Sequence, residues 1–407
     1  MGAMSASGGP FGFDPRMFEQ VPLFRELAKV MSWQGGPVNW DLAGQTATAL
    51  GTEGDAASTG VGHAFGDAVA TAEHWLDAVT SLAAVDGPAE ALTPSQWIAE
   101  AVTSQGLGAY IEPMAAGAAD ALGEQLPDEL RQLGAGAGGD DAMRQAMSSL
   151  GAMLYGMQAG VIGGHLAQQL WSCYDLGVPT IDARRVGPVG TALDHFAGDY
   201  DLDVAEVRHW LALSEAVHRR MFAGVSWLSD EVASLVREFA AAADFDPQSL
   251  MDSLGGGLDP SDPQALQQAL ESSDAFAIEP TTAQRRVLDR LQALVSFTEA
   301  YADTVVRSAA TERLPSLARI EEARQRRRVE HGPGERFLAQ LVGLDLTPAD
   351  LRTAQAFCDA VIEARQQEGL DRVWQDPACL PDLDELRDPS QWLVRMAARE
   401  LGVGDDG

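Results

Sequence analysis

The segment from Gln145 to Tyr174 limits the possible folds of this chain most strongly, because it contains no Asp, Glu, Lys or Arg. Gly156, Gly160 and Gly164 follow one another at four-residue spacing, which places them on one helix face and lets a second helix approach closely. Several polar side chains in the segment argue against a membrane span, namely Gln158, His165, Gln168 and Gln169. We expect a buried helix within the core of a soluble protein.

Helix-start signals occur along most of the chain, whereas strand signals are sparse. Capping residues followed by good first-turn residues predict helices that begin after Thr93, Asp203, Thr281, Thr347 and Asp388. The helix after Thr281 is expected to be long and to end at about Ala310. Residues 178–181 and 185–189 have the composition of a short hairpin or edge strand. The expected fold class is mainly α, with few short strands.

The chain is long enough to bury a sizeable core, since it has 407 residues and a hydrophobic content of 46%. We expect a single helical domain over residues 16–400, with tails at residues 1–15 and 401–407. An acidic, Gly-rich stretch at about 244–274 is expected to form a loop with one short helix. The apolar faces of the Gly-rich helix, the helix around His218 and the long helix after Thr281 predict one continuous core.

The chain is strongly acidic, with a formal net charge of −32 and a pI near 4.4. This charge argues against nucleic acid and anionic membranes as partners. The basic run Arg324 to Arg328 is expected to be a solvated helix face that pairs with Glu321, Glu322 and Glu330. Three widely spaced cysteines, together with an N-terminus that lacks a secretory signal, predict a reduced, cytoplasmic setting.

The stretch 213–218 matches most of the pattern H-E-x-x-H, in which two His side chains one turn apart bind zinc and the Glu activates a water. Glu215 and His218 stand at the right spacing, so Glu215 is the candidate general base and His218 a candidate ligand. Ser214 occupies the first ligand position, where a hydroxyl is a poor ligand for zinc. The alternative interpretation is a chance match in which Glu215 pairs with Arg219 at i+4.

Glu299 and Asp303 stand one turn apart in an otherwise apolar run of the long helix after Thr281. In zinc hydrolases the third ligand comes from a later helix, so Glu299 is the candidate third ligand and Asp303 a neighbour that orients it. The competing interpretation is that Asp303 pairs with Arg307 while Glu299 reaches solvent. If no metal is bound, the two carboxylates need another balance, which is protonation, an Arg or a different ion.

The chain resembles the actinobacterial zincin-like metallopeptidase type 2 family, whose members are described as candidate hydrolases. The resemblance covers roughly residues 10–400. It rests on many dispersed stretches, which are residues 9–13, 38–43, 174–176, 207–213, 227–228, 288–294, 299–303, 326–328, 343–346 and 372–374. It implies a zincin-like helical domain.

In this family the H-E-x-x-H pattern falls where residues 214–218 stand here. The resemblance therefore implies that His218 and Glu299 are zinc ligands and that Glu215 is the general base. The chain departs from the family pattern at Ser214, which removes a ligand, and mildly at Ala300.

Three functions from different classes remain open. The first is a catalytically silent zincin-like protein, whose cleft binds a partner protein or peptide because Ser214 removes one ligand. The second is an active zinc-dependent hydrolase, a peptidase, with a substitute ligand; the candidates are His195 first, then His165 and His209. A third is a helical adaptor in which the motif has no meaning.

We expect zinc binding to be weak or absent, and Ser214→His to raise zinc affinity. We also expect three side chains to converge: Glu215, His218 and Glu299.

Overall fold

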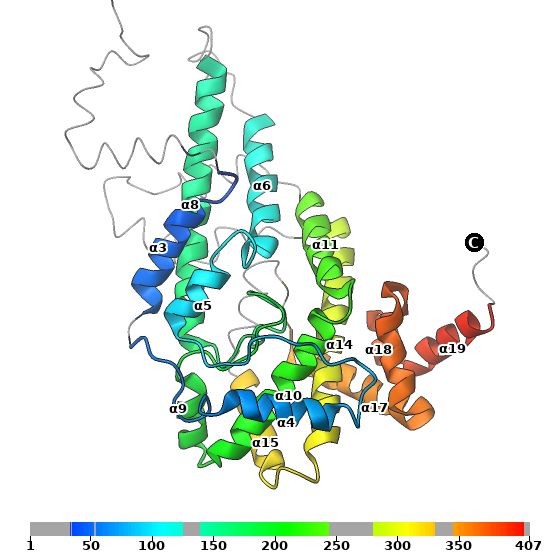
Figure 1. Cartoon of the computed structure of the whole chain (residues 1–407). Helices are drawn as coiled ribbons and strands as arrows, with labels where there is room; N and C mark the ends of the chain where they lie inside the picture. Colours follow the sequence, from blue (N-terminus) through cyan, green and yellow to red (C-terminus); the bar gives the residue numbers. More distant parts are fainter. Residues whose placement is uncertain are drawn as a thin grey trace, which may run out of the picture.

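The computed structural model describes residues 33–124, 139–243, 280–329 and 344–402, except residues 34, 53 and 345. Within these ranges the chain is mainly α-helical (Figure 1), as the sequence predicts. The described helices up to residue 243 are α3 (Trp40–Gly51), α4 (Phe65–Leu76), α5 (Pro94–Ala101), α6 (Gly108–Glu124), α8 (Gly139–Gln169), α9 (Ala192–Asp199), α10 (Val204–Phe222) and α11 (Leu228–Ala241). They are followed by α14 (Thr282–Ala310), α15 (Leu317–Val329), α17 (Pro348–Asp371), η2 (Arg372–Gln375), η3 (Pro377–Cys379), α18 (Leu383–Arg387) and α19 (Pro389–Glu400). The predicted N-terminal tail and the acidic Gly-rich loop lie outside the described residues.

Local capping signals set most helix starts. Four caps in the described residues form complete capping boxes, in which the cap side chain and the third helical residue each bond the other's backbone N–H; they are Thr93, Thr281, Thr347 and Asp382. Asp203 and Glu206 have the spacing of such a box at the start of α10, but only half of it forms. Asp203 caps the helix as expected, but the Glu206 carboxylate accepts a hydrogen bond from the backbone N–H of Ser316 at 2.6 Å. A contact from another part of the chain has replaced the local one.

The glycine-rich helix α8 packs closely on α3 and has α6 beside it (Figure 1). A Cβ atom added at Gly156 would lie 2.5 Å from the backbone oxygen of Asn39, and one at Gly160 would lie 2.6 Å from that of Ala43. At Gly164 the backbone oxygen of Ala47 would be 3.0 Å away. The predicted glycine face is therefore a helix contact. Two polar residues of α8 are more exposed than predicted: His165, and Gln168, whose amide donates a hydrogen bond to the backbone oxygen of Leu50 in α3 at 2.6 Å.

Alanine at two glycines of α8 tests this contact with a matched pair. We expect Gly160→Ala to lower the free energy of unfolding by about 1–3 kcal/mol, because the added methyl group overpacks against Ala43 and Thr46. A Cβ at Gly151 would meet no atom within 4 Å, so Gly151→Ala should be neutral or stabilise by up to about 1 kcal/mol through helix propensity. Urea unfolding of both variants measures the difference. Equal effects would mean that α3 and α8 are not in close contact.

Helix α10 lies at the centre of the fold, where it contacts α4, α14 and α9. The two arginines at its end attach it to α4: the Arg219 guanidinium lies 2.6 Å from the Glu73 carboxylate, and the fully buried Arg220 bonds both Glu73 and Asp77. Helix α14 packs against α10 on one side and against α17 and α11 on others. The central position of α10 explains why its polar residues need partners within the protein.

The C-terminal helices α17, α18 and α19 lie together on the side of the molecule away from α8 (Figure 1). Helix α17 is interrupted at Gln366, whose φ of 61° lies in the left-handed region. Where α17 ends, the Asp371 carboxylate accepts hydrogen bonds from Ser81 and from the Tyr301 hydroxyl of α14. This polar junction connects the C-terminal helices to the rest of the fold.

Extended structure in the described residues is limited to isolated bridges. Residues 186–189 pair in parallel with residues 89–92, and Pro188 pairs with Ser172 in the antiparallel sense. The sequence correctly placed extended chain at 185–189 but was wrong about its partner. Residues 178–181 form no bridge, because the segment from 88 to 92 supplies the hydrogen bonds instead.

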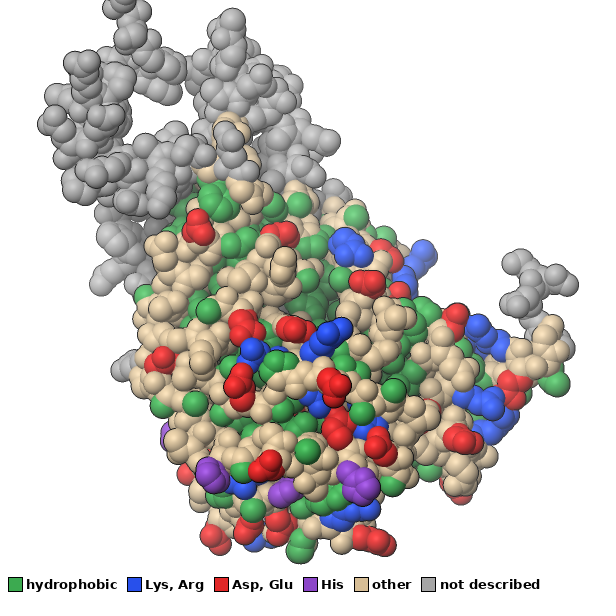
Figure 2. Space-filling view, viewed as in Figure 1, with side chains coloured by type: hydrophobic (Ala, Val, Ile, Leu, Met, Phe, Trp, Pro, Cys, Tyr) green, Lys and Arg blue, Asp and Glu red, His purple; other side chains and the backbone are tan. Residues whose placement is uncertain are grey.

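One cluster of buried apolar residues contains members from α8, α10 and α14, as the apolar faces of these helices predict. No helix in the described ranges is both long enough and apolar enough to cross a membrane. The cysteines Cys173, Cys358 and Cys379 are buried and unpaired. On the surface, acidic and basic side chains are interspersed over the visible face (Figure 2).

Candidate functional site

Glu215 is held inside the protein by backbone amides. From Leu211 to Phe222 every residue of α10 is buried except Ser214, which is partly exposed. One Glu215 carboxylate oxygen accepts a hydrogen bond from the backbone N–H of Tyr174, and the other accepts one from Gly187, both at 3.0 Å. The side chain is 1% exposed. Both oxygens are therefore engaged by the irregular segments 171–178 and 185–190, away from bulk water.

His218 connects α10 to α14. Its Nδ1 lies 2.8 Å from the backbone oxygen of Ser214, and its Nε2 lies 3.3 Å from the Glu299 carboxylate. Because both ring nitrogens face oxygen acceptors, the doubly protonated imidazolium is the form that satisfies both contacts. The structure thus brings His218 and Glu299 together, as predicted, whereas Glu215 points to the backbone amides of Tyr174 and Gly187.

Arg324 of α15 joins the two carboxylates of α14. Its guanidinium lies 3.4 Å from Glu299 and forms a short ion pair with Asp303. The same guanidinium lies over the Trp210 ring of α10, 5.7 Å from the ring centroid. His218, Glu299, Arg324 and Asp303 therefore form one connected cluster, which we call the α10–α14–α15 cluster.

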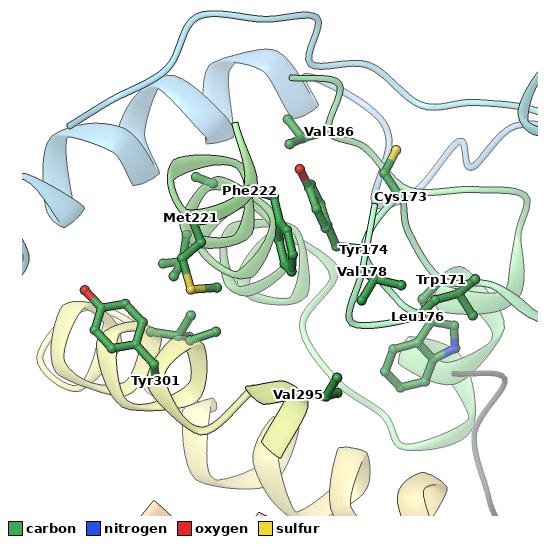
Figure 3. Close-up of a cluster of buried hydrophobic side chains, with 14 of the residues drawn as sticks. Trp171, Cys173, Tyr174, Leu176, Val178, Val186, Met221, Phe222, Val295 and Tyr301 are labelled. Atoms are coloured by element: carbon green, nitrogen blue, oxygen red, sulfur yellow. The ribbon is translucent and has the colours of Figure 1, made fainter. Parts of the chain in front are cut away.

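A short segment after α8, residues 170–177, covers this cluster. The Tyr174 ring stacks on His218 with centroids 5.3 Å apart and also on Phe222. Figure 3 shows the Tyr174 ring of this segment beside Phe222 of α10, with its hydroxyl directed towards Val186. Gly177 has a φ of +72°, and a Cβ there would lie 3.0 Å from the Glu299 carboxylate. A glycine is needed for both reasons.

Arg327 of α15 binds the segment 170–177 that covers the cluster. Its guanidinium donates to both carboxylate oxygens of Asp175 at 2.9 and 2.8 Å and lies 3.8 Å from the centroid of the Trp171 ring. Arg324 and Arg327 stand one turn apart on α15, so one helix face serves the cluster and its cover together.

The structure decides between several interpretations left open by the sequence. Arg219 pairs with Glu73 and Glu215 bonds backbone amides instead, while Arg307 pairs with Glu321 and Asp303 with Arg324. The Glu299 side chain is only 13% exposed and faces His218 instead of solvent.

The expectation of a solvated basic face on α15 is only partly correct. Arg326 pairs with Glu322 at 2.6 Å, as predicted. Arg324 and Arg327 turn inward because acidic side chains of other elements lie below that face. Their spacing of three residues, which puts both on one helix side, was the signal in the sequence that distinguishes them from Arg326.

The other candidate histidines do not join the cluster. His195, the first candidate substitute ligand, lies within α9 and its side chain is exposed. His165 is exposed on α8, and His209 stacks on Trp75 with ring centroids 5.7 Å apart. Among the described residues, no three His, Cys, Asp or Glu side chains stand together as a possible metal site.

In the described part of the chain, the donor set does not fit a zinc ion. His218 and Glu299 are two suitable ligands there, but zinc sites normally use three or four protein ligands. The carboxylate one turn from Glu299, that of Asp303, is paired with the cationic guanidinium of Arg324.

Burial and the cluster shift the pKa values of both motif residues. Burial raises the pKa of Glu215 to about 7, although hydrogen bonds from Gly187, Ser172 and Tyr174 and the charge of His218 act in the opposite direction. Burial lowers the pKa of His218, but the hydrogen bond and charge of Glu299 outweigh it, so the pKa is raised. A proton is thus favoured on both groups.

The fold and the cluster define a helical protein of the zincin-like class. Residues 38–393 match the zincin-like metallopeptidase family, and the chain belongs to this family. A search of curated proteins gives no match. A crystal structure from Chloroflexus aurantiacus, of a protein described as a candidate hydrolase with a novel fold, is similar over 88% of this chain and 99% of that chain. The TM-score is 0.57 and the identity 24%, which indicates a shared fold.

Proposed function

We propose that this family member is catalytically silent as a zinc peptidase and acts by binding a protein or peptide. The observation that carries the proposal is the position of Glu215. A general base of a metallopeptidase must reach the water that it activates. Here the carboxylate is almost fully buried and accepts two backbone hydrogen bonds. Ser214, in the first ligand position, supports the same conclusion because it is a poor zinc ligand.

Metal analysis and a peptidase assay test the catalytic half of the proposal. Protein purified without chelator should carry little zinc and should not cleave peptides above background, since His218 and Glu299 alone form an incomplete site. His218→Ala should not change the zinc content. Stoichiometric zinc in the wild-type protein that is lost in His218→Ala would contradict the proposal and would favour an active hydrolase.

Peptide display selection tests the binding half. The wild-type chain should enrich peptides over an unrelated helical protein of similar net charge, and their binding should saturate. A selection that enriches no sequence would contradict the binding half, whatever the outcome of the metal analysis.

The second candidate, a zinc-dependent hydrolase, is favoured by one observation. The Nδ1 atom of His218 faces the Ser214 carbonyl at 2.8 Å. In metal sites such a contact fixes the His tautomer and leaves Nε2 for the metal. In this chain Nε2 faces Glu299, the other candidate ligand. The zinc measurement on His218→Ala therefore discriminates between the two functions.

A further inference from the structure

We propose that Arg324 takes over the charge-balancing role of the metal ion and thereby opposes zinc binding between α10 and α14. This inference rests on the proposed loss of zinc chemistry and names the residue that maintains it. The guanidinium contacts Glu299 at 3.4 Å and Asp303 more closely. The other Glu299 oxygen lies 3.3 Å from His218. Arg324 is therefore bonded directly to one candidate zinc ligand and to the carboxylate beside it.

The surroundings make this cation hard to displace. The side chains of Arg324, Glu299 and Asp303 are 18%, 13% and 23% exposed, so water screens their charges only in part. The Trp210 ring lies against the guanidinium and adds a cation–π contact. A divalent ion bound by Glu299 would lie close to this fixed positive charge and would be repelled by it. Zinc binding would thus require Arg324 to leave both carboxylates.

Arg327 provides a matched comparison for Arg324. It lies one turn further along α15, pairs with the carboxylate of Asp175 and stacks on Trp171. Its ion pair and ring contact are of the same kind, but its hydrogen-bond partners are Asp175 and the Gln169 carbonyl. Loss of Arg327 removes the same charge from the same helix without freeing Glu299 or Asp303. If zinc affinity depends only on the net charge of α15, replacing either arginine should change it equally. If it depends on the contacts with Glu299 and Asp303, only replacement of Arg324 should change it.

The experiment measures zinc affinity by competition with a chromogenic chelator in a Ser214→His background, which supplies a third ligand beside His218 and Glu299. Adding Arg324→Gln should tighten zinc binding by at least about tenfold, because it removes the competing cation. Adding Arg327→Gln, or Arg324→Lys, which keeps the charge, should change the affinity by less than about threefold. Thermal unfolding with and without zinc should show a rise in midpoint that is largest for Ser214→His with Arg324→Gln.

Equal zinc affinities in the Arg324→Gln and Arg327→Gln backgrounds, or no measurable binding in the former, would overturn the inference. If Arg324→Gln does not fold, Asp303→Asn with Arg324→Gln removes one charge of each sign and supports the same comparison. Failure of the proposed function looks different, because the wild-type chain itself would then carry stoichiometric zinc. The ratio between the two arginine backgrounds tests Arg324 independently of that result.

Discussion

Replacing Asp371 with alanine is expected to lower the free energy of unfolding by roughly 3 kcal/mol, because the buried Tyr301 hydroxyl is left without this acceptor, at about 1–3 kcal/mol, and the more exposed donors lose a hydrogen bond to a charged group. The carboxylate accepts hydrogen bonds from five groups: the backbone N–H and hydroxyl of Ser81, the Thr80 hydroxyl, the Tyr301 hydroxyl and the Gln367 amide. Burial and the charge of Asp371 raise the pKa of Tyr301, so its phenol remains a donor.

Chemical denaturation measures the effect, and a second carboxylate of α17 is the control. Asp359 is exposed and accepts a hydrogen bond from Gln355 one turn away. Asp359→Ala should change the free energy of unfolding by no more than about 0.5 kcal/mol. Tyr301→Phe removes one of the five donors and should cost about 1 kcal/mol. A loss for Asp371→Ala no greater than that for Asp359→Ala would show that the junction contributes little.

Glu215→Gln is expected to flatten the dependence of stability on pH. The folded-state pKa of Glu215 is about 7, above its ordinary value of 4.5. Between these values the folded protein retains a proton that the unfolded chain releases, so stability falls as pH rises through this window. From pH 5.5 to 8 the wild-type protein should lose roughly 2 kcal/mol more than the variant.

His218 acts in the same direction as Glu215. Its pKa is raised in the folded state, so its contribution is fully present below its ordinary value of 6.5 and is lost as pH rises through the folded-state value. Urea unfolding at a series of pH values measures the summed contributions of Glu215 and His218 to stability. The difference between wild type and Glu215→Gln gives the contribution of Glu215. Glu363→Gln, an exposed exchange on α17, controls for the loss of one carboxylate. Parallel curves for wild type and Glu215→Gln would contradict a raised pKa at Glu215.

Much of the helical scaffold could be predicted because its signals are local. A capping box such as Thr281 with Gln284 is complete within four residues, and the resulting helix ends at Ala310 as expected. The glycine spacing of α8 also predicts a close helix contact, although it does not identify α3 as the partner. Local hydrogen bonding and helix periodicity thus specify the type of most elements and the face that each one buries.

The pairing of His218 with Glu299 was predictable for a different reason. The spacing of the motif and the carboxylate on a later helix matched a known ligand arrangement, so the family resemblance supplied the long-range information. Nothing in the spacing predicted that Glu215 would turn to the amides of Tyr174 and Gly187. Those donors belong to irregular backbone whose path depends on the packing of residues 171–190.

The sequence by itself determined most helices, their caps and the glycine contact face, and it singled out His218 and Glu299, which the structure brings together. Only the tertiary structure decided which charges meet. Arg324 has acidic residues near it in sequence, yet it pairs with Glu299 and Asp303 of another helix. The physical reason is that an exposed i+4 pair contributes only a few tenths of a kcal/mol, whereas a partly buried carboxylate requires a partner. The choice between such partners depends on which helices pack together, and no local pattern encodes it.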